Sequence, residues 1–187
     1  MRWGLERSRG DAVAVAMADA SDRPADLVRF FRTLEESGAD CVFGTRWSPA
    51  SRVVDYPLSK RLVNRMVNHA IRLLFGIRYN DVTNAFKLYR RHVIEGLQPL
   101  LSHHFNLTVE LPLKAIVRGY RYAVVPNDWV GRRSGQSKLR LKEMGSRYLF
   151  IVLYCLIEKW LSAGDYRRRE VAADASDPAA AGPPREA

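Results

Sequence analysis

The 187-residue chain has only two cysteines and four histidines, so it is poor in the residues that cross-link small secreted proteins through disulfides or metal ions. Cys41 and Cys155 both sit inside apolar runs. This placement favours buried, reduced thiols in a cytosolic setting over a disulfide framework. His92, His103 and His104 lack a regular ligand spacing and no cysteine accompanies them, which argues against a histidine metal site.

The chain also lacks a long hydrophobic run. The longest one, residues 148–157, is shorter than the roughly 20 apolar residues that span a bilayer, and Glu158 and Lys159 end it. Residues 1–10 are charged and contain no apolar segment of a secretory signal. We therefore expect residues 141–164 to form a helix that lies at a membrane interface or packs on a partner. Residues 165–187 should form a disordered tail.

The chain also has few acidic residues relative to basic ones. The chain has 30 Lys and Arg residues against 20 Asp and Glu, which gives a formal net charge of +10. This balance predicts an anionic partner, such as nucleic acid, anionic lipid or a phosphorylated substrate. A basic nucleic-acid-binding module would bind DNA or RNA tightly and in a salt-sensitive way. Because the sequence carries no recognition motif of that class, we expect no nucleic-acid partner.

The chain is organised around residues 13–24, where an apolar run stops at acids and a proline. Residues 13–17 are typical of a short buried strand in a parallel sheet covered on both faces. Asp19, Ser21 and Asp22 follow at its carboxyl end. Ligands bind at this edge in open α/β sheets, so these oxygens could hold a divalent cation. Alternatively, Ser21 or Asp22 caps the next helix, and the two roles can coexist.

The following residues predict alternating helices and strands. A helix at residues 24–37 and a strand at residues 41–45 complete a β-α-β unit. A parallel strand at residues 13–17 needs neighbours on both sides, yet little chain precedes it. We therefore expect an incomplete domain, or a sheet that another molecule completes. Beyond residue 45 the pattern predicts a loop at 46–57, helices at 59–75, 91–97 and 106–118, and strands near 80–89 and 120–129.

The strongest helical pattern lies at residues 59–75. Its cations lie off the apolar stripe, on a face that is usually solvated but that could collect phosphates beside a ligand-binding loop. The stripe consists of Leu58, Leu62, Met66, Ala70 and Leu74, widened by Val63, Val67 and Ile71, and the cations are Lys60, Arg61, Arg65 and Arg72.

Three further features are candidates for a binding site. Arg46 leaves the same sheet edge as Asp19, where it either reaches an anion or forms an exposed salt bridge. Glu110 is either an exposed first-turn acid favoured by the helix dipole or a base facing the cleft. Residues 131–138 (GRRSGQSK) form either a disordered basic loop or a loop that suits a diphosphate. The spacing of glycine and lysine there is not that of a Walker P-loop.

Six segments together resemble the family 2 glycosyltransferases, in particular the dolichyl-phosphate mannose synthase-like branch. That branch moves a hexose from a nucleotide sugar to a polyprenyl phosphate. The resemblance implies a GT-A type, Rossmann-like α/β sheet over residues 1–140, with helices on both faces, without its first strands, and followed by a C-terminal amphipathic helix. In the family's order the segments read MADASDRP, FGTRW, SKRLVNR, DVTNAFKLYRR, FNLTVELPLKAIVRGY and VPNDWVGRRSGQSK.

The resemblance also implies roles for single residues. Asp19 stands where the family has its second metal-binding acid, with Ser21 or Asp22 as helpers for Mg²⁺ or Mn²⁺, while Met17 stands where the first acid belongs. A metal and several arginines would neutralise the departing diphosphate. Arg46, Arg61 and Arg132 would contact phosphates of donor or acceptor, Arg132 with a catalytic role, Ser137 and Lys138 would close on the diphosphate, and Glu110 would lie near the acceptor.

The implied donor is a nucleotide sugar of the GDP-mannose or UDP-glucose type. The implied place of action is the cytoplasmic face of the membrane, where the chain would be peripheral and would meet an anionic surface. Since the family's opening strands are missing before Met1, the chain could instead be a non-catalytic remnant that binds a lipid phosphate or a partner.

Overall fold

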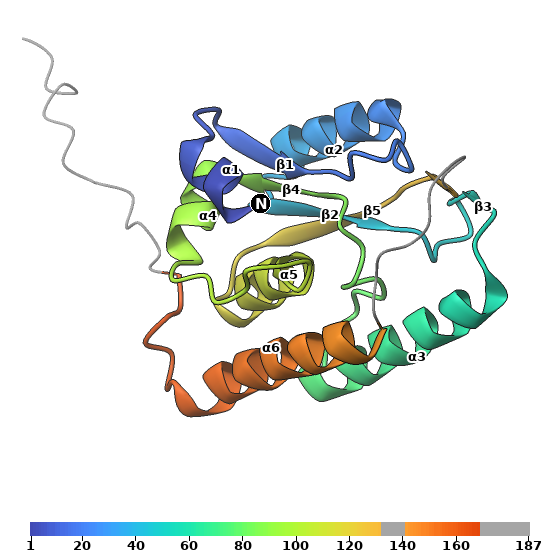
Figure 1. Ribbon diagram of the computed structural model, residues 1–187. Coiled ribbons are helices and arrows are strands. Elements are labelled where there is room, and N and C mark those ends of the chain that lie inside the picture. Colours follow the sequence, from blue (N-terminus) through green and yellow to red (C-terminus); the bar gives the residue numbers. More distant parts are fainter. Residues whose placement is uncertain (132–140, 169–187) are drawn as a thin grey trace, which may run out of the picture.

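A four-stranded mixed sheet forms the centre of the molecule (Figure 1). The computed structural model describes residues 1–131 and 141–168, with the backbone alone for residues 141–144. The strand order is β1-β4-β2-β5, in which β4 runs antiparallel to both neighbours and β2 runs parallel to β5. The strands are β1 (Ala12–Val15), β2 (Cys41–Thr45), β4 (Lys87–Arg90) and β5 (Tyr122–Pro126); β3 (Val53–Val54) pairs separately with β6 (Trp129–Val130).

The predicted surroundings of the first strand were wrong. β1 does not lie in a parallel sheet covered on both faces, because it pairs antiparallel with β4. In the described part of the chain it has no neighbour on its other side. Val13 and Val15 are buried while Ala14 between them is exposed. β1 is therefore an edge strand with one face in the core.

Helices cover both faces of the sheet, as predicted. On one face, α2 (Pro24–Glu36) buries Phe30 and Leu34 against strand residues that include Val42 and Leu88. The other face carries the larger core, to which α1 (Arg2–Arg7), α4 (Arg91–Gly96) and α5 (Leu107–Val117) contribute. α2 starts with Pro24 at its first turn, and Gly38 follows its end in the left-handed conformation.

Two long helices, α3 (Leu58–Phe75) and α6 (Leu141–Leu161), lie side by side below α5 in Figure 1. Lys159 of α6 donates a hydrogen bond of 2.7 Å to the carbonyl of Phe75 at the end of α3. The inner face of α3 is narrow, since only Asn68, Ile71 and Phe75 are buried. Neither these helices nor any other described helix is long and apolar enough to cross a bilayer.

Part of the predicted C-terminal tail belongs to the folded body. The backbone N–H of Arg168 donates to the carbonyl of Arg118 at 2.7 Å, and its guanidinium pairs with Asp40 at 2.7 Å. The prediction of disorder was therefore wrong for residues 165–168. Residues 169–187 lie outside the described residues.

Candidate functional site

The polar residues that follow β1, β2 and β5 gather at one edge of the sheet. These three strands run in the same direction and β4 runs against them, so the edge also holds the segment before β4. We call this edge the rim. It consists of residues 17–22, 45–47, 80–84 and 127–130. Hydrogen bonds tie its parts together, for example from Val130 N to the carbonyl of Ser21 (3.0 Å) and from Asn84 Nδ2 to Asn127 Oδ1 (3.0 Å).

Two oxygens of the acidic turn at residues 19–22, Ser21 Oγ and Asp22 Oδ1, are buried and have no hydrogen-bond partner among the described residues. The other carboxylate oxygen, Asp22 Oδ2, accepts from Met17 N at 3.4 Å. Asp19 Oδ1 accepts from Ser21 N at 3.2 Å, so the three side chains share one turn. Burial raises the pKa of Asp22 to about 6, and the nearby charge of Asp19 adds to the rise.

The structure bears on the two predicted roles of these residues, which are cation binding and capping of α2. Neither Ser21 nor Asp22 caps α2, because the N-cap is Arg23 and no side chain caps the helix end. The predicted cap was wrong. Buried oxygens without partners suit a cation, since Mg²⁺ is commonly bound by one or two carboxylates together with substrate phosphates. A complete protein cage is absent: within the described residues, no three His, Cys, Asp or Glu side chains form a metal-binding group.

Arg46 forms a buried ion pair with Asp81. Its Nε donates to Asp81 Oδ2 at 2.9 Å and its Nη2 to Oδ1 at 2.7 Å, while its backbone N–H donates to Oδ2 at 2.9 Å. Only 8% of the Arg46 side chain is exposed. Burial alone would lower the pKa of Arg46, but the Asp81 carboxylate outweighs it and raises this pKa further. The alternative of an exposed salt bridge was therefore wrong.

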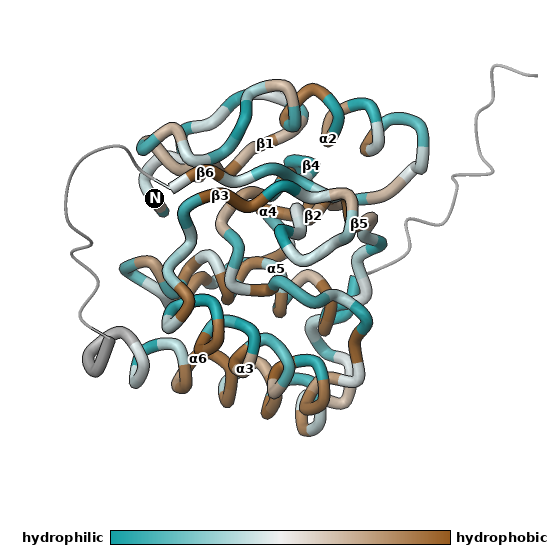
Figure 2. The backbone as a smooth tube through the Cα atoms, turned by 90° about the vertical axis from the view of Figure 1, so that its right-hand side faces the viewer, coloured by the Kyte–Doolittle hydropathy of each residue, from teal (hydrophilic) through white to brown (hydrophobic). Residues whose placement is uncertain are grey.

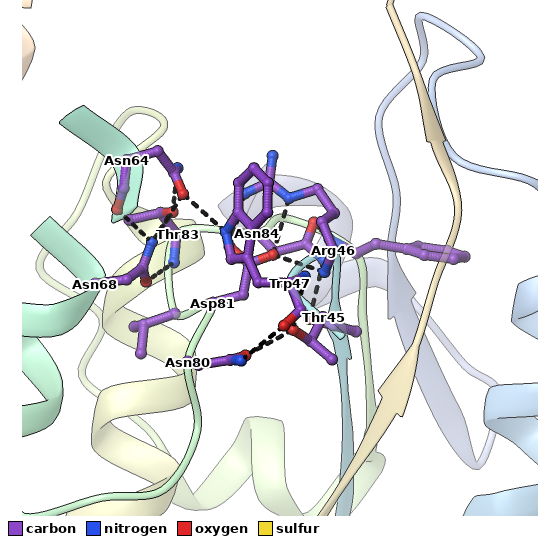
Figure 3. A network of polar contacts seen from close by, with 12 residues as sticks. Thr45, Arg46, Trp47, Asn64, Asn68, Asn80, Asp81, Thr83 and Asn84 are labelled. Carbon is purple, nitrogen blue, oxygen red and sulfur yellow. Dashed lines mark hydrogen bonds and ion pairs between the residues drawn. The ribbon is translucent and has the colours of Figure 1, made fainter. Parts of the chain in front are cut away.

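Trp47 connects the rim to α3 (Figure 3). Its indole Nε1 donates to Asn64 Oδ1 at 3.0 Å, and Asn64 Nδ2 donates to Thr83 Oγ1 at 2.8 Å. Asn68 completes this cluster, because its Nδ2 donates to Thr83 Oγ1 at 2.9 Å. The loop after β2, the middle of α3 and the turn before β4 are thus fixed relative to one another.

Two exposed arginines of α3 lie against Trp47. The guanidinium carbons of Arg61 and Arg65 are 5.5 Å and 5.6 Å from the centre of the indole ring. Among the described residues neither arginine has a carboxylate partner. Such a pair of guanidinium groups is suited to bind phosphate oxygens.

Glu110 lies in the interior, away from solvent. Its two carboxylate oxygens accept from the backbone N–H groups of Leu101 (2.8 Å) and Ser102 (2.7 Å), and Lys114 Nζ lies 2.8 Å from Oε1. Burial alone would raise the pKa of Glu110, but the hydrogen bonds from Lys114, Leu101 and Ser102 hold it below its ordinary value. Glu110 is neither an exposed first-turn acid nor a base facing a cleft, so both interpretations were wrong.

The structure brings Asp19, Ser21, Asp22 and Arg46 together at the rim, with Arg61 beside Trp47. Arg132, Ser137 and Lys138 lie outside the described residues. Sequence reasoning missed the parts played by Trp47, Asn64, Asp81, Thr83 and Asn84. The signal for Trp47, Asp81, Thr83 and Asn84 was available in the segments FGTRW and DVTNAFKLYRR, whose polar residues stand beside predicted strand ends. Asn64 lies in the segment SKRLVNR of the predicted helix, where its spacing alone does not mark it.

A buried lysine supports the turn before β4. Lys87 Nζ donates to the carbonyls of Val82 (3.0 Å), Asn84 and Thr108 (3.2 Å). Burial lowers the pKa of Lys87 to about 7. Because Asp81 and Asn84 belong to the turn that Lys87 holds, this residue contributes to the geometry of the rim.

Comparisons with known proteins complete the description. No family model matches the chain. Polyprenol monophosphomannose synthase of Mycolicibacterium smegmatis is 32% identical over 140 residues, which cover 73% of this chain and 52% of that protein. Undecaprenyl-phosphate mannosyltransferase of Micrococcus luteus is 28% identical over 162 residues, which cover 85% of this chain and 65% of that protein. The chain thus spans only part of the length of the curated relatives it matches.

The fold is also found among solved structures. Glucosyl-3-phosphoglycerate synthase from Mycobacterium tuberculosis superposes with a TM-score of 0.55 at 16% sequence identity, over 83% of this chain and 52% of that one. That structure is a complex with Mn²⁺, UDP-glucose and glycerol 3-phosphate, and another structure of the same enzyme contains Mg²⁺ and UDP.

Proposed function

Because the chain is similar in sequence to polyprenyl-phosphate mannosyltransferases and has the fold of GT-A glycosyltransferases, we propose that it transfers a hexose to a polyprenyl phosphate. The donor is a nucleotide sugar of the GDP-mannose or UDP-glucose type. The reaction takes place at the cytoplasmic face of the membrane, with the chain bound peripherally.

The observation that carries this proposal is the gathering of acids and arginines at the rim. Transfer of a hexose from a nucleotide sugar releases a nucleoside diphosphate, and the negative charge that develops on it is the main electrostatic demand of the reaction. Cations fixed before the reaction starts meet that demand without reorganisation. Arg46 is fixed in this way, since Asp81 holds its guanidinium at two points.

Asp19, Asp22 and Ser21 are the residues that would hold Mg²⁺ or Mn²⁺. Their oxygens fit the ion, because Ser21 Oγ and Asp22 Oδ1 are buried and unpartnered and Asp19 belongs to the same turn. Phosphate oxygens of the donor would complete the ligand set. When bound, the ion supplies positive charge to the departing diphosphate.

Arg61 is proposed to bind the acceptor phosphate, with Arg65 beside it. Both are exposed, both lie against Trp47, and neither is engaged by a carboxylate in the described structure. The phosphate of the acceptor is already anionic, so it attacks without a strong general base, which agrees with the buried, fully bonded state of Glu110. For Arg132, Ser137 and Lys138, which lie outside the described residues, the proposal of diphosphate contact rests on resemblance alone.

A second candidate function has one observation in its favour. Met17 stands where the family resemblance implies the first acid of a metal-binding pair, so the turn offers fewer carboxylates than expected. A chain of this kind could bind the lipid phosphate without transferring a sugar. It would then bind the acceptor and leave the nucleotide sugar intact.

A transfer assay separates the two candidates. The full chain is mixed with Mn²⁺ or Mg²⁺, labelled GDP-mannose or UDP-glucose, and polyprenyl phosphate in detergent, and labelled lipid is extracted. We expect lipid-linked hexose from the wild type and none from Asp19→Ala. The matched control is Asp11→Ala, an exposed aspartate just before β1, which should retain full transfer.

Two results would decide against parts of the proposal. Unchanged turnover in Asp19→Ala would rule out its metal role. Binding of polyprenyl phosphate by the wild type without any turnover, with either donor and either ion, would favour the non-catalytic alternative.

A further inference from the structure

Three aromatic side chains lie at the rim or directly beside it: Trp47 after β2, Tyr56 between β3 and α3, and Trp129 in β6. All three are partly exposed. In the described part of the chain, neither hydrophobic core includes any of them. Because packing of the core does not account for these rings, they are candidates for contact with a ligand.

The three rings form one row. Tyr56 lies in the middle, with its ring centre 5.6 Å from that of Trp47 and 4.8 Å from that of Trp129. The planes of the two pairs are inclined by 75° and 59°. Both distances are within the range in which aromatic rings attract each other. We call Trp47, Tyr56 and Trp129 the aromatic row.

The two ends of the aromatic row meet the two charged parts of the rim. At one end, the guanidinium carbons of Arg61 and Arg65 lie 5.5 Å and 5.6 Å from the ring centre of Trp47. At the other end, Trp129 forms an antiparallel backbone bridge with Asp22 of the acidic turn. The row therefore runs from the arginines proposed to bind the acceptor phosphate to the turn proposed to face the diphosphate.

The backbone fixes the middle of the row. β3 and β6 pair in parallel and lie side by side (Figure 2). Between β3 and Tyr56, Asp55 adopts the left-handed conformation with φ of 54°. A Cβ atom at residue 131 would lie 2.7 Å from the Asp55 carbonyl oxygen, so only glycine allows this close approach. The contact holds the segment that carries Tyr56 against the strand that carries Trp129.

The chemistry of the row indicates the part of a substrate that it suits. The face of an aromatic ring is electron-rich and attracts groups with partial positive charge. A pyranose ring presents such groups on its faces, because its oxygens draw electrons from the C–H bonds, while its hydroxyl groups point outward from the edge. A hexose can therefore stack on an aromatic ring and keep its hydroxyl groups solvated or hydrogen-bonded.

The geometry of the proposed reaction places the hexose at this position. An oxygen of the acceptor phosphate forms a bond to the anomeric carbon. The bond from that carbon to the diphosphate breaks, and its electron pair leaves with the nucleoside diphosphate. The hexose thus lies between the two phosphate groups during the transfer, as the aromatic row lies between the residues proposed to bind them. The nucleobase, beyond the diphosphate, lies elsewhere.

We propose that the aromatic row binds the hexose of the donor by stacking, with Tyr56 and Trp129 as the stacking residues. Trp47 lies at the end of the row that the arginines occupy. This role deepens the proposed function and rests on it for the identity of the donor. Contact between the row and a hexose is nevertheless measurable without any transfer.

The first test compares the affinities for nucleotide sugars and for nucleoside diphosphates. Equilibrium binding of GDP-mannose, UDP-glucose, GDP and UDP to the full chain is measured in the presence of Mg²⁺. Tyr56→Leu/Trp129→Leu keeps apolar side chains and removes both ring faces. It should bind the nucleotide sugar about tenfold more weakly and the corresponding diphosphate within about twofold of the wild type.

Two further double variants are controls for this test. Tyr56→Phe/Trp129→Phe keeps a ring at both positions and should bind the nucleotide sugar within about threefold of the wild type. Trp160→Leu/Tyr166→Leu removes the same two residue types at positions that are 64% and 51% exposed, in α6 and after it, and should bind like the wild type. Thermal melts establish that each variant is folded.

The second test observes the stacking directly and needs no variant. Methyl α-mannoside and methyl α-glucoside carry a hexose without phosphate or nucleotide. In saturation-transfer NMR, irradiation of the aromatic protons of the wild type should saturate the C–H protons of one of these hexosides. The effect should fall by at least half in Tyr56→Leu/Trp129→Leu and persist in Trp160→Leu/Tyr166→Leu.

Three outcomes would overturn the proposal. These are a leucine variant that binds the nucleotide sugar as the wild type does, an equal loss for nucleotide sugar and diphosphate, or a wild type that transfers no saturation to either hexoside. The proposed function fails separately. A wild type that contacts the hexoside but yields no lipid-linked hexose retains the sugar site and contradicts the transferase, whereas full transfer by the leucine variant contradicts only the role of the row.

Discussion

Arg46 and Asp81, 35 residues apart in the sequence, form a two-point ion pair in the interior of the rim. Asp81 is completely buried, and its carboxylate accepts three hydrogen bonds from Arg46 alone. The pair fixes the loop after β2 to the turn before β4. It therefore sets the distance between the two parts of the site that come from different strands.

Breaking this pair should destabilise the fold strongly. Arg46→Ala leaves a buried carboxylate without its partner, which costs about 3–5 kcal/mol of unfolding free energy. The control is Arg23→Ala, which breaks an exposed pair with Asp128 in which the arginine side chain is 63% exposed, and should cost less than about 1 kcal/mol. Urea unfolding measures both. Equal costs for the two variants would contradict the structural role of Arg46.

The raised pKa of Asp22 makes stability depend on pH. An unperturbed aspartate has a pKa of 3.8, whereas the pKa of Asp22 in the folded chain is about 6. Between these values the folded state keeps a proton that the unfolded state has lost. The contribution of Asp22 to stability is thus complete below pH 3.8 and is lost as the pH rises through 6.

The measurement compares the wild type with Asp22→Asn, without divalent ions, from acid to neutral pH. Over this range the unfolding free energy of the variant should rise by about 1–2 kcal/mol relative to that of the wild type. This is less than the full effect of the Asp22 pKa shift, because solvent reaches part of the side chain. A difference between the two proteins that does not change with pH would show that the Asp22 carboxyl titrates normally.

Removing the indole of Trp47 should weaken binding of the acceptor phosphate. Trp47→Ala frees the side chains of Arg61 and Arg65, each of which loses a contact with the ring. Cation–π contacts are worth about 0.5–1 kcal/mol each at exposed sites, so the KM for polyprenyl phosphate should rise about tenfold.

Trp3→Ala is the control for Trp47. Trp3 also carries an arginine over its ring, since the guanidinium carbon of Arg7 is 4.3 Å from the ring centre, but it belongs to α1. This variant should leave the KM unchanged. Trp47→Phe keeps the aromatic ring and loses the hydrogen bond to Asn64, and should lie between wild type and Trp47→Ala. If Trp47→Ala and Trp47→Phe had the same KM as the wild type and Trp3→Ala, Trp47 would have no role in acceptor binding.

Glu110→Gln should affect folding and leave the chemistry alone. The substitution removes the charge partner of the fully buried Lys114, at a cost of about 3 kcal/mol in unfolding free energy. The exposed Glu36→Gln is the control and should be neutral. At a temperature where both variants are folded, kcat should equal that of the wild type. A selective loss of kcat, with normal stability, would return Glu110 to the acceptor site.

Local sequence predicted most elements because their signals are local. The helix α2 has Pro24 at its start and Gly38 beyond its end, and α3 ends at Gly76 in the left-handed conformation. Single residues therefore determine these helix boundaries. The apolar runs at Cys41–Thr45 and Tyr122–Pro126 became β2 and β5. The family resemblance, which the comparisons confirm, rests on such segments in a common order.

What remained unpredicted depends on contacts between distant segments. Nothing near residues 13–17 indicates that β4 inserts between β1 and β2 with the opposite direction. Periodicity identified the apolar stripe of α3 but carries no information on which side the sheet lies. The orientation of the Glu110 side chain was also unpredictable from its position in the helix. It is determined by the backbone N–H groups of Leu101 and Ser102, which donate hydrogen bonds to its carboxylate.

In the described part of the chain no strand lies beside the outer edge of β1, which has a practical consequence for work with the purified chain. Half of the peptide groups of Ala12–Val15 face away from β4, and unpaired strand edges act as templates for strands of other molecules. The chain thus has a route to aggregates through this strand edge. Insoluble material that forms without lipid, and that detergent fails to disperse, should therefore be attributed to intermolecular sheet growth at this margin.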